Sequence, residues 1–225
     1  MSYPWSAMSF GTNRWNRLRY TFWAPAYDLF VRALDARRRS SIALLDPRPG
    51  ERLLIVGAGT GADLPHLPDG CTVLATDLTP AMLRRARPRR RHGMQLAVMD
   101  GHALGVPDGA FDAVVLHLIL AVIPEPDRCL REAARALRPG GRAIVFDKFV
   151  RGGAPPLAVR VLNPAVRILF TDMTRRFEEI LARSGGDLAP VADRPSFFGG
   201  LYRHILLRKS DAPRAQPASP ARVAR

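Results

Sequence analysis

Residues 53–61 read LLIVGAGTG, a short apolar run that leads directly into three closely spaced glycines. A buried strand followed by such a loop lets the backbone turn sharply and approach a ligand without a Cβ in the way. The same stretch satisfies the G-x-G-x-x-G/A fingerprint of dinucleotide sites through Gly57, Gly59 and Ala62. The loop therefore predicts a ligand that contains a nucleoside and leaves the choice of ligand open.

Short apolar runs and helical stretches alternate after this loop, which is typical of a parallel sheet with crossover helices. We predict an α/β fold, a Rossmann-like doubly wound and mostly parallel seven-stranded sheet. The expected strands are 52–56, 72–76, 95–99, 111–116, 142–146, 188–192 and 202–208. The expected helices are 80–86, with Thr79 as N-cap, 126–138 and 174–184.

The predicted domain, residues 47–209, has a segment on each side of it. All three Trp fall within the first 30 residues with interleaved Arg, so 1–46 is predicted to form amphipathic helices that act as a lid or an interfacial anchor. Residues 210–225 are a basic Pro/Ala tail, which we predict to be disordered. An irregular apolar insertion, 149–172, follows the fifth strand and is expected to cap the site.

Composition narrows the class of protein. The 225 residues are enough for one α/β domain, and no run of uncharged apolar residues is long enough to span a membrane. The two cysteines have no metal-type spacing, so we expect no metal site. The formal charge of +14, nearly all from Arg, attracts polyanions such as nucleic acid or an anionic membrane face.

A carboxylate stands where a nucleoside would need one. Asp77 lies twenty residues after Gly57, at the end of the second expected strand. In that place it can accept hydrogen bonds from both ribose hydroxyls. Nicotinamide enzymes use the same device, so Asp77 supports a nucleoside ligand without choosing which one.

Three later stretches narrow the choice: Asp100-Gly101 after the third strand, Leu116-His117 at the end of the fourth, and LRPGG at 137–141. With these, the chain resembles the class I S-adenosylmethionine-dependent methyltransferases from about residue 27 to 208. Within that family it is most similar to the branch of phosphatidylethanolamine N-methyltransferases and quinone-biosynthesis C-methyltransferases. The resemblance implies S-adenosyl-L-methionine as cofactor.

The resemblance also implies a set of cofactor-binding residues. The glycine loop would line the methionine and ribose part, Asp77 would bind the ribose hydroxyls, and Leu78 would lie against the adenine. Asp100 would bind the adenine amino group, His117 would lie near the sulfonium, and Tyr27 would cover the cofactor. The full set is Tyr27, Gly57, Gly59, Thr60, Gly61, Asp77, Leu78, Asp100, Gly101 and His117.

Two positions leave alternatives open. The family usually carries an acid two places before the first glycine, where this chain has Ile55, so we expect weaker cofactor binding or a compensating group elsewhere. His117 is either a site residue, and then a candidate base, or a satisfied histidine at a strand end. No catalytic residue is assigned.

The expected function is methylation of a lipid or another membrane-partitioned acceptor, such as the amine of phosphatidylethanolamine. The alternatives are a quinone-precursor C-methyltransferase and a methyltransferase of a soluble small molecule. The sequence lacks the Tyr-x-x-x-Lys pair expected of a nicotinamide oxidoreductase, and it contains no recognised nucleic-acid-binding motif. We expect a cytoplasmic protein, peripheral at the inner membrane face, and no protein partner is implied.

Overall fold

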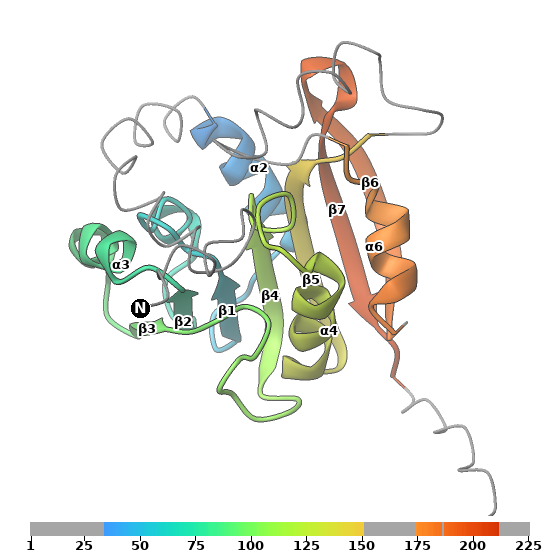
Figure 1. Ribbon diagram of the computed structural model, residues 1–225. Coiled ribbons are helices and arrows are strands. Elements are labelled where there is room, and N and C mark those ends of the chain that lie inside the picture. The colour runs from blue at the N-terminus through green and yellow to red at the C-terminus, as the bar shows by residue number, and fades with distance from the viewer. Residues whose placement is uncertain (1–33, 151–173, 186, 212–225) are drawn as a thin grey trace, which may run out of the picture.

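The computed structural model describes residues 34–150, 174–185 and 187–211 (Figure 1). The predicted helices before residue 34, most of the insertion after the fifth strand, and the tail from residue 212 lie outside these ranges. The elements are α2 (Asp35–Leu45), β1 (Arg52–Val56), η2 (Leu64–His66), β2 (Thr72–Asp77), α3 (Pro80–Ala86), η3 (Arg87–Arg89), β3 (Met94–Val98), β4 (Phe111–His117), α4 (Pro126–Ala136), β5 (Leu137–Lys148), α6 (Phe177–Arg183), β6 (Leu188–Phe197), η4 (Phe198–Gly200) and β7 (Tyr202–Lys209).

The seven strands form one sheet in the order β3-β2-β1-β4-β5-β7-β6. Strands β1 to β5 pair in parallel, whereas β7 is antiparallel to both β5 and β6. The order changes direction between β1 and β4, which is where open α/β sheets form a ligand crevice beyond the strand ends. The predicted α/β, mostly parallel seven-stranded fold is confirmed.

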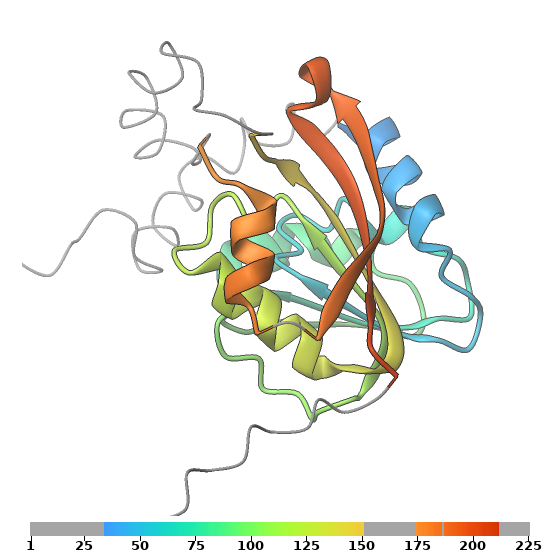
Figure 2. The same ribbon diagram turned by 90° about the vertical axis from the view of Figure 1, so that its right-hand side faces the viewer.

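Helices cover both faces of the sheet. Figure 2 shows α4 and α6 on one face and α2 on the other. The first face buries a cluster that includes Leu54, Leu116 and Leu130, and the second buries Ile42, Ile55 and Val115. Because successive strand residues point to opposite faces, strands covered on both sides become nearly continuous apolar runs, which explains the legible sequence pattern.

Two strands, β5 and β6, extend by several residues beyond their predicted bounds, whereas β2, β4 and β7 extend by one residue. Strand β5 begins at Leu137, directly after α4, because Leu137 pairs with Phe111 before the register shifts to Ala113–Arg142. Strand β6 runs on to Phe197 despite its two prolines, which are tolerated because β6 is the edge strand of the sheet. No helix among the described ranges is long and apolar enough to cross a membrane.

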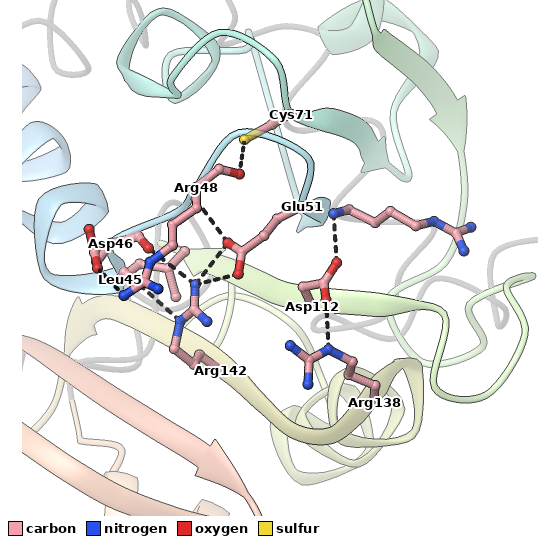
Figure 3. Close-up of polar contacts among 9 residues, drawn as sticks. Leu45, Asp46, Arg48, Glu51, Cys71, Asp112, Arg138 and Arg142 are labelled. Atoms are coloured by element: carbon pink, nitrogen blue, oxygen red, sulfur yellow. Dashed lines mark hydrogen bonds and ion pairs between the residues drawn. The ribbon is translucent and has the colours of Figure 1, made fainter.

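A group of ion pairs closes the sheet at the end opposite the glycine loop (Figure 3). The Arg142 guanidinium donates to both carboxylate oxygens of Glu51, at 3.0 and 2.8 Å, and to the carbonyls of Leu45 and Asp46, both at 3.1 Å. These contacts join β5 to the end of α2 and to the start of β1. Arg142 therefore binds the last turn of α2 and holds this helix against the sheet.

We predict that Arg142→Gln lowers the free energy of unfolding by about 2 kcal/mol, because hydrogen bonds to charged groups contribute more than neutral ones. Urea unfolding at pH 7 measures the change. The control is Arg208→Gln, which removes the same charge from the exposed residue that pairs with Arg142 in β7. Equal loss in the two variants would contradict the role given to Arg142.

Candidate functional site

An open cleft lies at the carboxyl ends of β1, β2, β3 and β4. Of the predicted residues, six line it together: Gly57, Gly59, Asp77, Leu78, Asp100 and Gly101. Predicted positions from the glycine loop and from the ends of β2 and β3 thus converge on one cleft.

The glycine loop is held in place by Asp77. Its two carboxylate oxygens accept the backbone N–H groups of Gly59 and Thr79, both at 2.8 Å. Gly57 and Gly59 have φ values of 74° and 55°, which favour glycine. Burial raises the pKa of Asp77, against the lowering effect of those two N–H donors. Donors from a ligand would favour the ionised form further.

Asp100 is positioned by a histidine that the sequence reasoning missed. Asp100 Oδ1 accepts the backbone N–H of His102 at 2.9 Å and lies 3.0 Å from His102 Nδ1. His102 Nε2 accepts the backbone N–H of Glu125 at 3.2 Å, so Nδ1 carries the proton toward Asp100. His102 therefore connects this carboxylate to the residue before α4.

The opposite wall of the cleft is apolar and comes from the loop after β4. Leu118, Ile119, Val122 and Ile123 all line it. Leu118 has a φ of 57°, and such a conformation costs a bulky residue about 1–3 kcal/mol. A Cβ on Gly57 would lie 2.8 Å from Ile119 Cδ1, so this glycine is needed for close packing of the two walls.

Two polar groups, the buried Asp147 and the half-buried Arg175, hold the backbone of this apolar loop. The Asp147 carboxylate, at the end of β5, accepts the N–H of Ala121 at 2.8 Å. Arg175 donates through Nη1 to the carbonyl of Leu120 and, at 2.7 Å, to that of Ile123. The loop is thus tied to β5 and to the segment before α6. Asp147 and Arg175 do not themselves line the cleft, whereas the apolar side chains of the loop do.

His117 is not at the cleft. Its side chain is fully buried, with Nδ1 2.7 Å from Asp63 Oδ1 and Nε2 2.9 Å from Ser41 Oγ. Arg38 completes the group, with Nη1 2.9 Å from each Asp63 oxygen. The expectation that His117 lies near the reacting groups is therefore corrected, because its ring points to the α2 face while the next residue, Leu118, lines the cleft.

Three other predicted residues lie elsewhere. Thr60 is fully buried, and its carbonyl accepts Arg89 Nη1 at 2.7 Å, which secures the loop from η3. A Cβ on Gly61 would meet Ala86 of α3 at 2.9 Å, so Gly61 serves close packing. Tyr27 lies outside the described residues.

The arrangement fits a cofactor that contains a nucleoside. Carboxylates at the ends of β2 and β3 offer acceptors for ribose hydroxyls and for an amino group. Leu78, Met82 and Met99 provide apolar surface between them, and the loop glycines leave room for close backbone approach. Among the described residues no group of His, Cys, Asp and Glu could hold a metal ion.

Comparison with known proteins gives a consistent result. A family model described as a methyltransferase domain matches residues 54–145. The phosphatidylethanolamine N-methyltransferase of Cereibacter sphaeroides is 37% identical over 146 residues, which cover 62% of this chain and 71% of that protein. The quinone-biosynthesis C-methyltransferase UbiE of Acidiphilium cryptum is 39% identical over 129 residues, 53% of this chain and only 52% of that protein.

Solved structures share the fold at low identity. The [4+2]-cyclase SpnF matches with a TM-score of 0.73 and 18% identity, covering 91% of this chain and 98% of that one. A possible histamine N-methyltransferase of Thermotoga maritima matches with a TM-score of 0.65 and 18% identity, covering 85% and 99%.

We predict that Asp63→Asn destabilises the fold by about 3 kcal/mol at pH 7, because it leaves the buried Arg38 charge without its counter-ion. Burial alone would raise the pKa of Asp63, but Arg38 and His117 hold it well below 3.8. The ionised carboxylate therefore stabilises the fold fully above about pH 4, and this contribution falls as the pH drops further.

Urea unfolding from pH 7 to pH 3 measures this. The difference between wild type and variant should shrink as the pH falls below 3.8, the ordinary pKa of Asp63. Asp69→Asn is the control, since Asp69 is 90% exposed in its ion pair with Arg91. A difference that grows toward acid pH would contradict the assignment.

Proposed function

The chain belongs to the S-adenosylmethionine-dependent methyltransferase family, and on this premise we propose that it methylates a lipid or another membrane-partitioned acceptor. The favoured acceptor atom is the amine nitrogen of phosphatidylethanolamine. The observation that carries the proposal is the 37% identity to a phosphatidylethanolamine N-methyltransferase over most of that protein's length. The charge of +14 and the aromatic, Arg-containing first 30 residues support it, because both suit an anionic membrane surface.

The residues of the cleft suit the family's cofactor, which supplies a methyl group already activated on a sulfonium. We propose that Asp77 binds the ribose hydroxyls, with Leu78 against the adenine and Asp100 at the adenine amino group, supported by Gly101. Gly57, Gly59, Thr60 and Gly61 would form the loop beside the methionine part. Tyr27 stays a proposal for a covering residue.

The chain's own contribution is placement and exclusion of water. Methyl transfer needs an aligned approach more than acid–base groups, so a dry, shaped cleft serves it. An amine acceptor resembles Lys, with a pKa of roughly 10, and must lose a proton before it attacks. His117 cannot take that proton from where it lies, because Ser41 and Asp63 occupy its two nitrogens. We propose that the apolar wall at Leu118 and Ile119 desolvates the amine instead.

A second candidate is C-methylation of a quinone precursor. It is favoured by the 39% identity to the UbiE protein, although the match spans about half of that protein. An apolar cleft wall suits a prenylated ring as well as a lipid amine. Both acceptors partition into membranes, so we propose peripheral membrane association in either case.

We predict that Asp77→Asn weakens the binding of S-adenosylmethionine about 100-fold, since hydrogen bonds to a charged group are each stronger than neutral ones. Titration calorimetry at 20 °C, with folding checked by circular dichroism, measures the affinity. Asp46→Asn, an exposed site at the end of α2, is the control. A change of less than threefold for Asp77→Asn would remove the ribose role.

The acceptor is tested by following label from methyl-tritiated S-adenosylmethionine incubated with the protein and a total bacterial lipid extract. We expect label in monomethylated phosphatidylethanolamine. Label in the quinone fraction would establish the second candidate in its place. If the cofactor binds and no lipid is labelled, the lipid proposal is wrong, and soluble acceptors follow.

A further inference from the structure

The face of the sheet under α2 carries two rows of side chains across β5, β7 and β6. Paired residues of antiparallel strands point to the same face. Phe146, His204 and Arg194 are paired in turn and make one row, and Lys148, Tyr202 and Phe197 make the next. The second row lies two residues further along β5, at the carboxyl edge of the sheet.

Three cations lie on this face, each on a different element: Arg37 on α2, Lys148 on β5 and Arg194 on β6. Arg37 Cζ lies 5.6 Å from the centre of the Phe197 ring, and Lys148 Nζ lies 5.3 Å from that of Tyr202. In the part of the chain that the structure describes, no carboxylate lies within 4.0 Å of any of the three.

The nearby acids are engaged elsewhere. Asp147 precedes Lys148 but points to the opposite face, where it accepts the N–H of Ala121. Asp193 and Arg203 pair with each other, also on that opposite face, and Asp35 at the start of α2 contacts His66 at 2.8 Å. Among the described residues, Arg37 and Arg194 therefore have no carboxylate within 4.0 Å, whereas Lys148 is attracted by its chain neighbour Asp147.

The pKa of His204 is affected by these positive charges. Its Nε2 is buried and has no hydrogen-bond partner among the described residues. Burial, followed by the proximity of His117, Arg37 and Arg194, lowers the pKa of His204 to about 4. Burial also lowers the pKa of Lys148, against the raising effect of the Asp147 carboxylate. An anion bound above these groups would relieve the mutual repulsion of the cations.

The cationic surface adjoins the cleft. Leu118, which lines the cleft, packs in one buried cluster with Leu34, Phe146 and Tyr202. Phe197 packs against the same cluster. A molecule whose reacting atom enters the cleft past the β4 wall would therefore carry its next group over β5 and β7, toward Lys148.

We propose that Arg37, Lys148 and Arg194 form a binding surface for the phosphodiester of a phospholipid acceptor. The cations would bind the phosphate oxygens. A phospholipid amine and its phosphate are joined by two carbons, so one molecule places both groups close together. The inference rests on the proposed lipid acceptor.

The test measures KM for phosphatidylethanolamine in neutral detergent micelles. The variant is Arg37→Gln/Lys148→Met/Arg194→Gln. We expect its KM to rise about tenfold, as the loss of three ionic contacts predicts, with kcat within twofold and unchanged affinity for S-adenosylmethionine. The matched control, Arg84→Gln/Arg87→Gln/Arg90→Gln, removes three exposed charges from α3 and the residues after it, and its KM should change less than twofold.

A second measurement does not depend on activity. Binding of glycerophosphoethanolamine, followed by phosphorus NMR, should be lost in the first triple variant and retained in the control. If it is lost as expected while wild type labels no lipid, the surface stands and the lipid methyltransferase proposal falls. Equal KM in both triple variants, or equal glycerophosphoethanolamine binding, overturns the surface even if wild type methylates the lipid. Inorganic phosphate bound as tightly as glycerophosphoethanolamine would overturn the lipid headgroup as the ligand.

Discussion

The buried carboxylate of Asp63 is the interaction on which the cleft depends. It lies just after the glycine loop and contacts Arg38 of α2 and His117 of β4. A charge removed from water is costly unless it is paired and hydrogen-bonded, so this carboxylate requires both partners in place at once. It thereby holds three segments together: the loop, the helix that covers it, and the strand end beside it. Ile55 packs in the apolar core on the same face.

The same principle operates on the other face, where polar groups stabilise a strained wall that is itself apolar. The positive φ of Leu118 turns the chain out of β4. Asp147 and Arg175 then bind the backbone of the loop that follows, so its peptide groups are satisfied without exposing a polar surface to the ligand. The cleft thus combines a polar side, made by Asp77 and Asp100, with an apolar side, made by the loop after β4. That division suits a cofactor that is polar at one end and reacts at the other.

The sequence predicted these two sides unequally, for a physical reason. Strands buried on both faces are continuous apolar runs, and a carboxylate after such a run must lie at the sheet edge, so β1 to β4, Asp77 and Asp100 were predictable. A shift of one residue along a strand turns the side chain to the other face of the sheet. At the end of β4 it is Leu118, and not the predicted His117, that lines the cleft. The contacts of His102 with Glu125, and of Arg175 with Leu120 and Ile123, join residues distant in sequence, which no local pattern indicates.

The division also bears on what distinguishes this chain from its relatives. A cyclase shares the whole fold at 18% identity, so the fold by itself does not determine the reaction. The family model ends at residue 145, and all the polar groups proposed for the cofactor lie before that point. Lys148, Arg194 and the two aromatic rings beside them lie after it, on β5, β6 and β7. On the proposed assignment, the groups that bind the acceptor lie on α2, β6, β7 and the end of β5, outside the matched residues 54–145, whereas Asp77 and Asp100 lie within them.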